Sequence, residues 1–167
     1  MSNSAGPRDL VAQARENWKE QGWADAASGM AATTSIMRAH QILLARVDAQ
    51  LRPLNLTFAR YELLMLLSFS RDGALPMRVI GERLQVHPTS VTSAVDRLER
   101  DELVARRQHP TDRRAVLVVL ADTGRKLAMR ATRRVNDHVF LDLGISRAAA
   151  DELTDLVNGL RRSEGDF

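Results

Sequence analysis

The sequence predicts a mainly α-helical protein that carries one small β-wing. Apolar residues recur at helical spacing over most of the 167 residues, whereas runs typical of strands are confined to one region. That region lies inside residues 77–124, MRVIGERLQVHPTSVTSAVDRLERDELVARRQHPTDRRAVLVVLADTG. The order there is a short helix, a turn, a second helix and then two strands, so the expected β-structure interrupts a helical chain.

Helices are expected before this region. Residues 9–21 hold apolar side chains at helical spacing, and Gly22 ends that helix. A long helix follows over residues 26–51, and Pro53 stops it. The apolar run 57–69 predicts a core helix with Thr57 as its N-cap, and Asp72 and Gly73 predict a turn.

The remaining elements follow from turn residues and periodicity. Pro76 and Pro88 suit the first turns of two helices. The run AVLVVL has little polar alternation, which indicates a strand covered on both faces. The expected helices are 76–84, 88–101, 123–143 and 146–160, and the expected strands are 103–108 and 115–120.

Composition excludes several classes of protein. The chain has no cysteine, which rules out disulfides and thiolate chemistry. No apolar run approaches the roughly 20 residues that span a membrane, and the first residues lack the apolar stretch of a signal peptide, so we expect a cytoplasmic protein. The four histidines His40, His87, His109 and His138 form no close-spaced pair, so no metal site is expected.

Positive charge is concentrated in one part of the chain. Residues 76–134 carry 13 Lys or Arg against 7 Asp or Glu, a net charge of +6, although the whole chain has a net charge of only +3. A solvated surface explains such asymmetry as well as a polyanion-binding surface does. The residues described next favour a polyanion.

The helix over residues 88–101 has two different faces. Val91, Ala94, Val95 and Leu98 form its inward face. Small hydroxyl side chains and arginines form the opposite face, and they allow close approach to a DNA major groove. Candidate DNA-binding residues on and around this helix are Arg78, His87, Thr89, Ser90, Ser93 and Arg97. Arg97 is placed to reach a guanine edge or a phosphate; for His87 a helix cap and a plain turn residue are alternatives.

The tip of the expected hairpin is strongly basic. Arg113 and Arg114 are adjacent there, and a DNA minor groove offers them a narrow, negative site. We assign Arg113 to the groove and expect Asp112 to position Arg114 through an ion pair, although the two arginines are interchangeable. Arg106 and Arg107, on the preceding strand, are expected to contact the DNA backbone.

These elements together form a winged helix-turn-helix, and the run VTSAVDRLERDELVARRQHPTDRRAVLVVLADTG resembles the MarR family of bacterial transcription regulators. The family hallmark is a wing with Asp-x-Arg, five residues and Leu-Thr, which Asp112, Arg114 and Leu120 match. The chain departs at Ala121, where Thr is usual, so a helix cap from Asp122 or Thr123 is expected instead. It also departs at Glu102, where Gly commonly closes the recognition helix.

The resemblance implies a single MarR-like domain over residues 1–167. A DNA-binding lobe over 57–121 would be flanked by dimerisation helices within 9–51 and 123–162. Such proteins are homodimers that bind double-stranded DNA at pseudo-palindromic operators, and many release it when a small aromatic or phenolic acid binds. The apolar stripes of the terminal helices also need a partner, either their own subunit or a second copy.

An aromatic acid would need an apolar wall and one cation or imidazole. Trp18, Met37, His40 and Arg60 could supply them as effector-binding residues, with a satisfied core histidine and packing tryptophans as the alternative. The extra tryptophan-bearing N-terminal helix also resembles the urate-responsive branch of the family.

The expected function is therefore a homodimeric, ligand-responsive repressor. A DNA-binding regulator without a small-molecule effector, controlled by abundance or a partner protein, is the alternative. An enzyme is not expected, because the sequence has no nucleophile–base constellation, glycine-rich phosphate loop or paired metal motif, and no cofactor is expected. A winged helix used for protein contact is disfavoured by the basic hairpin tip.

Overall fold

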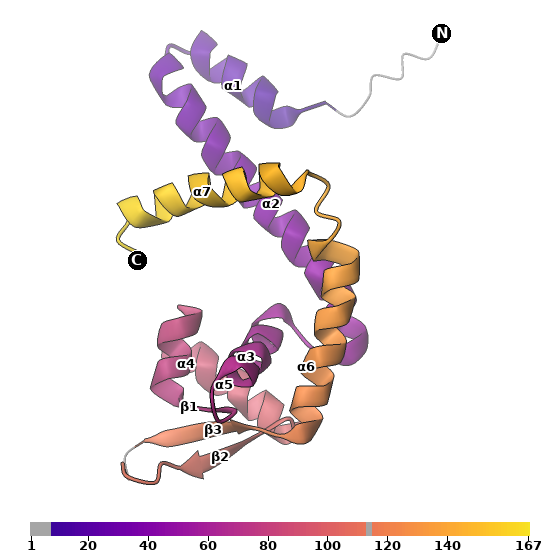
Figure 1. Ribbon diagram of the computed structural model, residues 1–167. Helices are drawn as coiled ribbons and strands as arrows, with labels where there is room; N and C mark the ends of the chain where they lie inside the picture. Colours follow the sequence, from indigo (N-terminus) through magenta and orange to yellow (C-terminus); the bar gives the residue numbers. More distant parts are fainter. Residues whose placement is uncertain (1–7, 113–114) are drawn as a thin grey trace. The chain divides into compact units, whose positions relative to one another are not determined.

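The computed structural model describes residues 8–112 and 115–167, which fall into two compact units, 1–46 and 47–167. The first unit holds α1 (Leu10–Glu20) and most of α2 (Ala24–Leu51), as Figure 1 shows. Asp9 caps α1 by accepting hydrogen bonds from the amides of Val11 and Ala12. Gly22, with φ of +84°, makes the turn that ends it. Both helices agree with the sequence prediction.

Several apolar side chains in the first unit are solvent-exposed. Trp18 and Trp23 meet edge to face, with ring centroids 5.3 Å apart, but Trp23 is still 54% exposed. Leu10, Ile36, Met37 and Ile42 are also exposed large apolar residues. Ala27, by contrast, is a buried residue of this unit.

The core of the second unit is built around α3 (Phe58–Phe69). Pro53 lies in the short 3-10 helix η1 (Arg52–Leu54), which directly follows α2 as expected. Thr57 caps α3, as predicted, by accepting a hydrogen bond from the amide of Arg60 at 3.5 Å. Buried residues from α3 include Tyr61, Leu63, Leu64 and Leu67, and they join one hydrophobic cluster with residues of the other elements.

The helix-turn-helix comprises α4 (Met77–Leu84) and α5 (Pro88–Arg100). Gln85 ends α4 in the left-handed region, with φ of +53°. His87 caps α5, because its Nδ1 accepts a hydrogen bond from the amide of Thr89 at 3.3 Å. Of the alternatives left open for His87, the structure therefore selects the helix cap.

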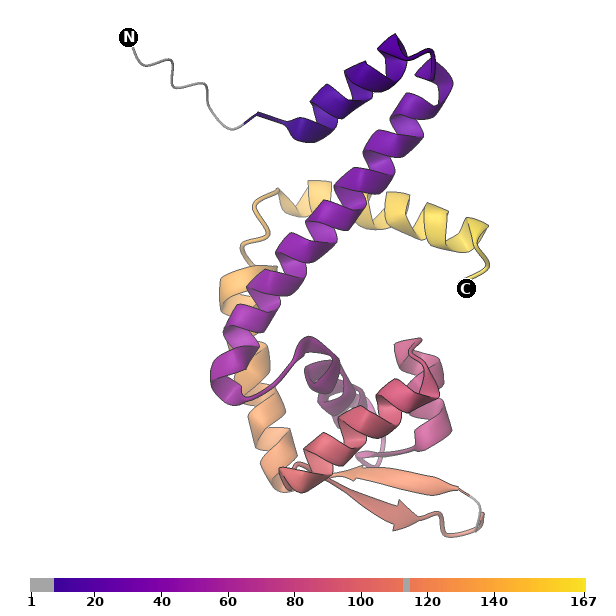
Figure 2. The ribbon, with the colours of Figure 1, turned by 180° about the vertical axis from the view of Figure 1, so that it is seen from behind.

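The β-structure is a three-stranded antiparallel sheet, not the expected two-stranded hairpin. Its order is β1 (Ala74–Pro76), β3 (Val116–Leu120) and β2 (Val104–Gln108). Figure 2 shows β2 and β3 extending from the helices as the wing. β3 is central, which explains its apolar sequence, but only Val118 and Leu120 are buried and Val116 is exposed. The expectation that both faces are covered is therefore wrong at the outer end of the strand.

The next helix, α6 (Asp122–Val135), is shorter than predicted because residues 136–140 form a π-helical turn, η2 (Asn136–Phe140). The predicted cap from Asp122 or Thr123 is also wrong. Ala121 is the N-cap and makes no side-chain hydrogen bond, while the hydroxyl of Thr123 donates to the carbonyl of Glu102 at 2.6 Å. Gly124 packs so closely that a Cβ there would lie 2.1 Å from the carbonyl oxygen of Leu103.

The last helix, α7 (Arg147–Ser163), begins at Ser146, which accepts a hydrogen bond from the amide of Ala149. Its apolar stripe is exposed in the single chain: Leu153 is 46%, Leu156 69% and Leu160 52% exposed. The tail beyond α7 reaches the helix-turn-helix, where the side-chain amide of Gln85 donates to the carboxylate of Asp166 at 2.5 Å.

Candidate nucleic-acid interface

The exposed face of α5 carries the residues that the sequence assigned to DNA. Val91, Val95 and Leu98 are buried in the core. The exposed residues include Thr89, Ser90, Ser93, Arg97 and Arg100, with Asp96 among them. A helix with a packed apolar face and an opposite face of small hydroxyls and guanidiniums can enter a major groove, where those groups reach base edges and phosphates.

Arg106 does not extend into solvent as a backbone-contacting residue would. Its Nη2 donates to the carboxylate of Asp96 at 2.5 Å and its Nη1 donates to that of Glu99 at 2.5 Å. Its backbone amide also donates to Glu99 Oε1 at 2.8 Å. These hydrogen bonds connect β2 to α5, and the contact between Arg106 and the DNA backbone stays a prediction.

The hydrogen bonds of Arg106 change the pKa of Glu99 on α5 and its own pKa. The hydrogen bonds from the Arg106 amide and guanidinium hold the pKa of Glu99 below its ordinary value. Burial tends to lower the pKa of Arg106, but the hydrogen bonds to Glu99 and Asp96 raise it overall. Arg106 thus pairs with both carboxylates, and its positive charge offsets part of their negative charge beside a helix that would face a polyanion.

The wing turn is held by a histidine that the sequence did not single out. Nδ1 of His109 accepts hydrogen bonds from the amides of Thr111 at 3.4 Å and Asp112 at 3.2 Å. The carbonyl of Asp112 accepts a hydrogen bond from the amide of Ala115 at 3.0 Å. Arg113 and Arg114 lie outside the described residues, so their assignment and the expected ion pair with Asp112 stay predictions. Arg107 is exposed on β2.

A groove of about 720 Å³ runs between the first turn of α3 and the exposed face of α5, and we call it the basic groove. Three arginines line it: Arg60 from α3, and Arg97 and Arg100 from α5. The other lining residues are Thr57, Ala59, Thr89, Ser90, Ser93, Ala94 and Asp96. Asp96 is the one acidic residue among the three arginines of the lining, so the groove is net positive, which suits a phosphate.

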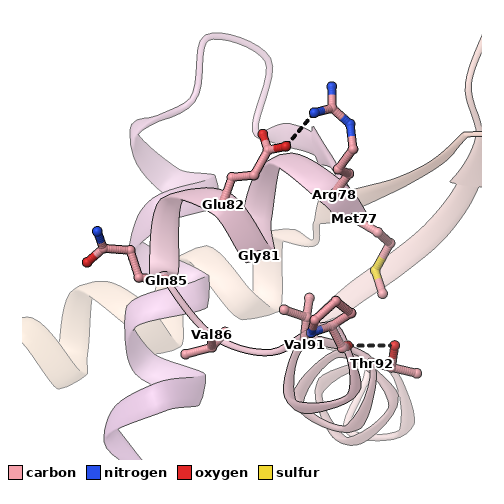
Figure 3. Close-up of a pocket in the computed structure, with 9 residues that line it drawn as sticks. Met77, Arg78, Gly81, Glu82, Gln85, Val86, Val91 and Thr92 are labelled. Atoms are coloured by element: carbon pink, nitrogen blue, oxygen red, sulfur yellow. Dashed lines mark hydrogen bonds and ion pairs between the residues drawn. The ribbon is translucent and has the colours of Figure 1, made fainter. Parts of the chain in front are cut away.

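A second groove, of about 650 Å³, lies between α4 and α5 and is mainly apolar (Figure 3). Met77, Val86 and Val91 contribute apolar surface. Arg78, a predicted DNA-binding residue, lies at its rim and is paired with Glu82 on the same helix. We call this the apolar groove; its shape and size suit a small organic ligand.

Comparison with known proteins places this geometry in a family. The MarR family model matches residues 56–116. The solved structure of Sco5413, a MarR family transcriptional regulator from Streptomyces coelicolor, is 49% identical, covers 84% of this chain and 97% of its own, and superposes with a TM-score of 0.77. The chain belongs to the MarR family.

Two further relatives match this chain with lower identity or lower coverage. The HTH-type transcriptional repressor MdtR of Bacillus subtilis is 40% identical over 63 residues, and this match spans only 41% of MdtR. CouR of Rhodococcus jostii, solved bound to p-coumaroyl-CoA, is 26% identical, with a TM-score of 0.65 over 75% of this chain and 87% of its own. Its relatives identify the MarR chain as a DNA-binding transcription regulator rather than an enzyme.

The four residues predicted to bind an effector are divided between the two units of this MarR protein. Trp18 contacts Trp23, and Met37 and His40 are exposed on α2. Arg60 belongs to the second unit and lines the basic groove. Their assignment to one effector site therefore stays a prediction, and the apolar groove, which no sequence signal indicated, is an additional candidate.

In residues 8–112 and 115–167 of this MarR protein, no group of three or more His, Cys, Asp or Glu side chains is placed to hold a metal ion. None of the helices described there has the length and apolar character needed to cross a membrane.

Proposed function

We propose that this protein is a homodimeric repressor whose two α5 helices read the half-sites of a pseudo-palindromic operator. The observation that carries the proposal is the face of α5. It presents hydroxyls and arginines to solvent, while Arg106 pairs with Asp96 and Glu99 and offsets part of their negative charge. On this proposal Thr89, Ser90, Ser93 and Arg97 contact bases and phosphates. Arg107 contacts the DNA backbone, and Arg113 enters the adjacent minor groove.

Dimerisation is supported by the apolar stripe of α7. Leu153, Leu156 and Leu160 are about half exposed or more in the single chain. Exposed apolar surface of this kind is removed from water when a second copy covers it. Two copies would also supply the twofold symmetry that a pseudo-palindrome requires.

Control by a small aromatic or phenolic acid is supported by the apolar groove. Its walls from Met77, Val86 and Val91 match the apolar part of an aromatic acid. Arg78 also lines the groove, and its guanidinium is paired with Glu82 (Figure 3). The groove touches α5, so a bound acid could shift the helix that reads DNA. The named ligand of CouR, a coumaroyl thioester, is also aromatic. Control by abundance or a partner protein is the second candidate.

Selection from a random-sequence duplex pool tests the proposal directly. We expect the protein to enrich a pseudo-palindrome and Arg97→Ala to relax base preference at one position in each half-site, at a cost of about 1–3 kcal/mol in operator binding. Failure to enrich any sequence, with the protein folded, would refute it. Titration of the selected complex with a panel of aromatic acids then separates the two candidate modes of control, since only an effector-controlled repressor would release the duplex.

A further inference from the structure

The basic groove contains a cation from outside the recognition helix. Arg60 belongs to the first turns of α3, yet it lines the same groove as Arg97 and Arg100 of α5. We propose that this groove holds one phosphate of the DNA backbone and that Arg60 supplies part of its positive charge. This inference rests on the proposed function, and it replaces the expected effector role of Arg60.

The hydrogen bonding of Arg60 is incomplete, which is the first observation behind the proposal. Its Nε donates to the hydroxyl of Thr57 at 3.3 Å. Its Nη1 is buried and has no hydrogen-bond partner, because the nearest carboxylate oxygen, on Asp101, is 3.9 Å away. A buried guanidinium N–H without an acceptor is unfavourable, so the positive charge of Arg60 is not fully compensated by its own neighbours. A phosphate in the groove would be attracted to that charge.

Asp101 keeps two arginines close together. Its Oδ2 lies 3.9 Å from Nη1 of Arg60 and also 3.9 Å from Nε of Arg97. One carboxylate therefore stands between two guanidiniums, at distances too long for hydrogen bonds, and it leaves a net positive charge. A phosphodiester has the charge and the acceptor oxygens to bridge two such groups.

The remaining lining also favours a phosphate. Thr89, Ser90 and Ser93 are exposed and bring hydroxyl donors to the groove. The one acidic lining residue, Asp96, is paired with Arg106 at 2.5 Å. Since the groove is continuous with the face of α5 that would enter the major groove, the phosphate nearest to it belongs to the flanking backbone.

Salt dependence of DNA binding is the measurement that tests this role. The probe is a 30-base-pair duplex selected by the protein itself from a random-sequence pool, titrated by fluorescence anisotropy between about 50 and 250 mM KCl. For Arg60→Gln we expect log Kobs to fall less steeply with log salt, by about 0.9 per protomer bound, and binding at about 150 mM salt to weaken about fivefold per protomer. Arg60→Lys, which keeps the charge, should retain the wild-type slope.

Controls separate a phosphate contact from a purely structural role. Arg130→Gln removes an equal charge from the exposed surface of α6, away from the groove, and should leave the slope unchanged. A lower melting temperature for Arg60→Gln with an unchanged slope would mean that Arg60 merely tethers α3 to α5, and it would overturn the proposal. Inorganic phosphate provides a second check. If it raises the melting temperature of the wild type but not of Arg60→Gln, while the two proteins have the same salt slope, the groove binds free phosphate but not the DNA backbone, and the proposal is overturned.

A second variant keeps the proposal testable if Arg60→Gln does not fold. Asp101→Asn removes the carboxylate that competes with the phosphate for both arginines, so binding should tighten several-fold. Asp122→Asn, the matched control at the start of α6, should not have this effect. Equal affinity of Asp101→Asn and wild type would contradict the proposal, whereas a wild type that binds no duplex at all would instead refute the proposed function.

Discussion

Glu102 adopts a backbone conformation that favours glycine. Its φ is +56°, and the amide of Leu103 donates to the carbonyl of Leu98 at 2.9 Å, which closes α5 with a left-handed residue. A side chain costs about 1–2 kcal/mol in that conformation, whereas glycine brings a smaller entropic cost. We expect Glu102→Gly to raise the free energy of unfolding by about 0.5–1 kcal/mol, measured by urea denaturation. Glu102→Ala is the control: an equal gain would show that lost charge, not backbone strain, is responsible.

Ala121 offers a second stabilising substitution. It has the extended backbone of an N-cap, with φ of −79° and ψ of 159°, but no side-chain oxygen to accept a hydrogen bond from the first turn of α6. Ala121→Thr should therefore add about 1 kcal/mol to the free energy of unfolding. Thermal melts would check it, with Ala121→Val as a β-branched control that lacks the oxygen. No difference between the two variants would contradict the capping argument.

At the scale of elements, the ion pair between Glu99 of α5 and Arg106 of β2 predicts that the stability of the fold depends on pH. The pKa of Glu99 is lowered in the folded protein because Arg106 donates to its carboxylate. The resulting stability is present above the pKa of Glu99 in the unfolded chain and is lost as pH falls through the lower folded value. The difference in free energy of unfolding between wild type and Glu99→Gln should thus be largest above about pH 5 and shrink in more acidic solution. Denaturant titrations at several pH values check this; a difference independent of pH would count against it.

The contacts between α5 and β2 could not be predicted from the sequence, although the helices could. The helices were predictable because apolar spacing on α3, α5 and α6 matches their buried faces. The partner of Arg106 was not, because Asp96, Glu99 and Arg106 meet only when β2 folds back beside α5. β1 escaped prediction for a similar reason: its three residues have no strand pattern of their own and are defined by pairing with β3.

The residues at which helices end were harder to predict than the presence of the helices. The periodicity of Ala131, Val135 and Val139 continues through η2, so the change from α- to π-helical hydrogen bonding leaves no mark on the apolar pattern. In the candidate site, the face of α5 was predictable because an exposed Ser or Arg opposite a buried Val is a local pattern. The two grooves were not, since each joins residues of separate helices.

For the whole molecule, the exposed stripe of α7 predicts a dimer of about 37 kDa, twice the 18.6 kDa of one chain. Leu156→Asp would place a carboxylate on that stripe, where burial of a charge is strongly unfavourable. Because Leu156 is 69% exposed in the single chain, the variant should remain folded but dissociate at micromolar concentration. Light scattering with circular dichroism checks both points. Thr154→Asp, on the opposite side of α7, should stay dimeric; dissociation of both variants, or of neither, would contradict the assignment.

The absence of a side chain at Gly124 has a mechanical consequence. The start of α6 presses directly on the carbonyl of Leu103, which also accepts a hydrogen bond from the amide of Ala121. A residue with a Cβ at position 124 would therefore have to move the start of α6 away from Leu103. Leu103 directly precedes β2, so the same displacement would be passed on to the base of the wing.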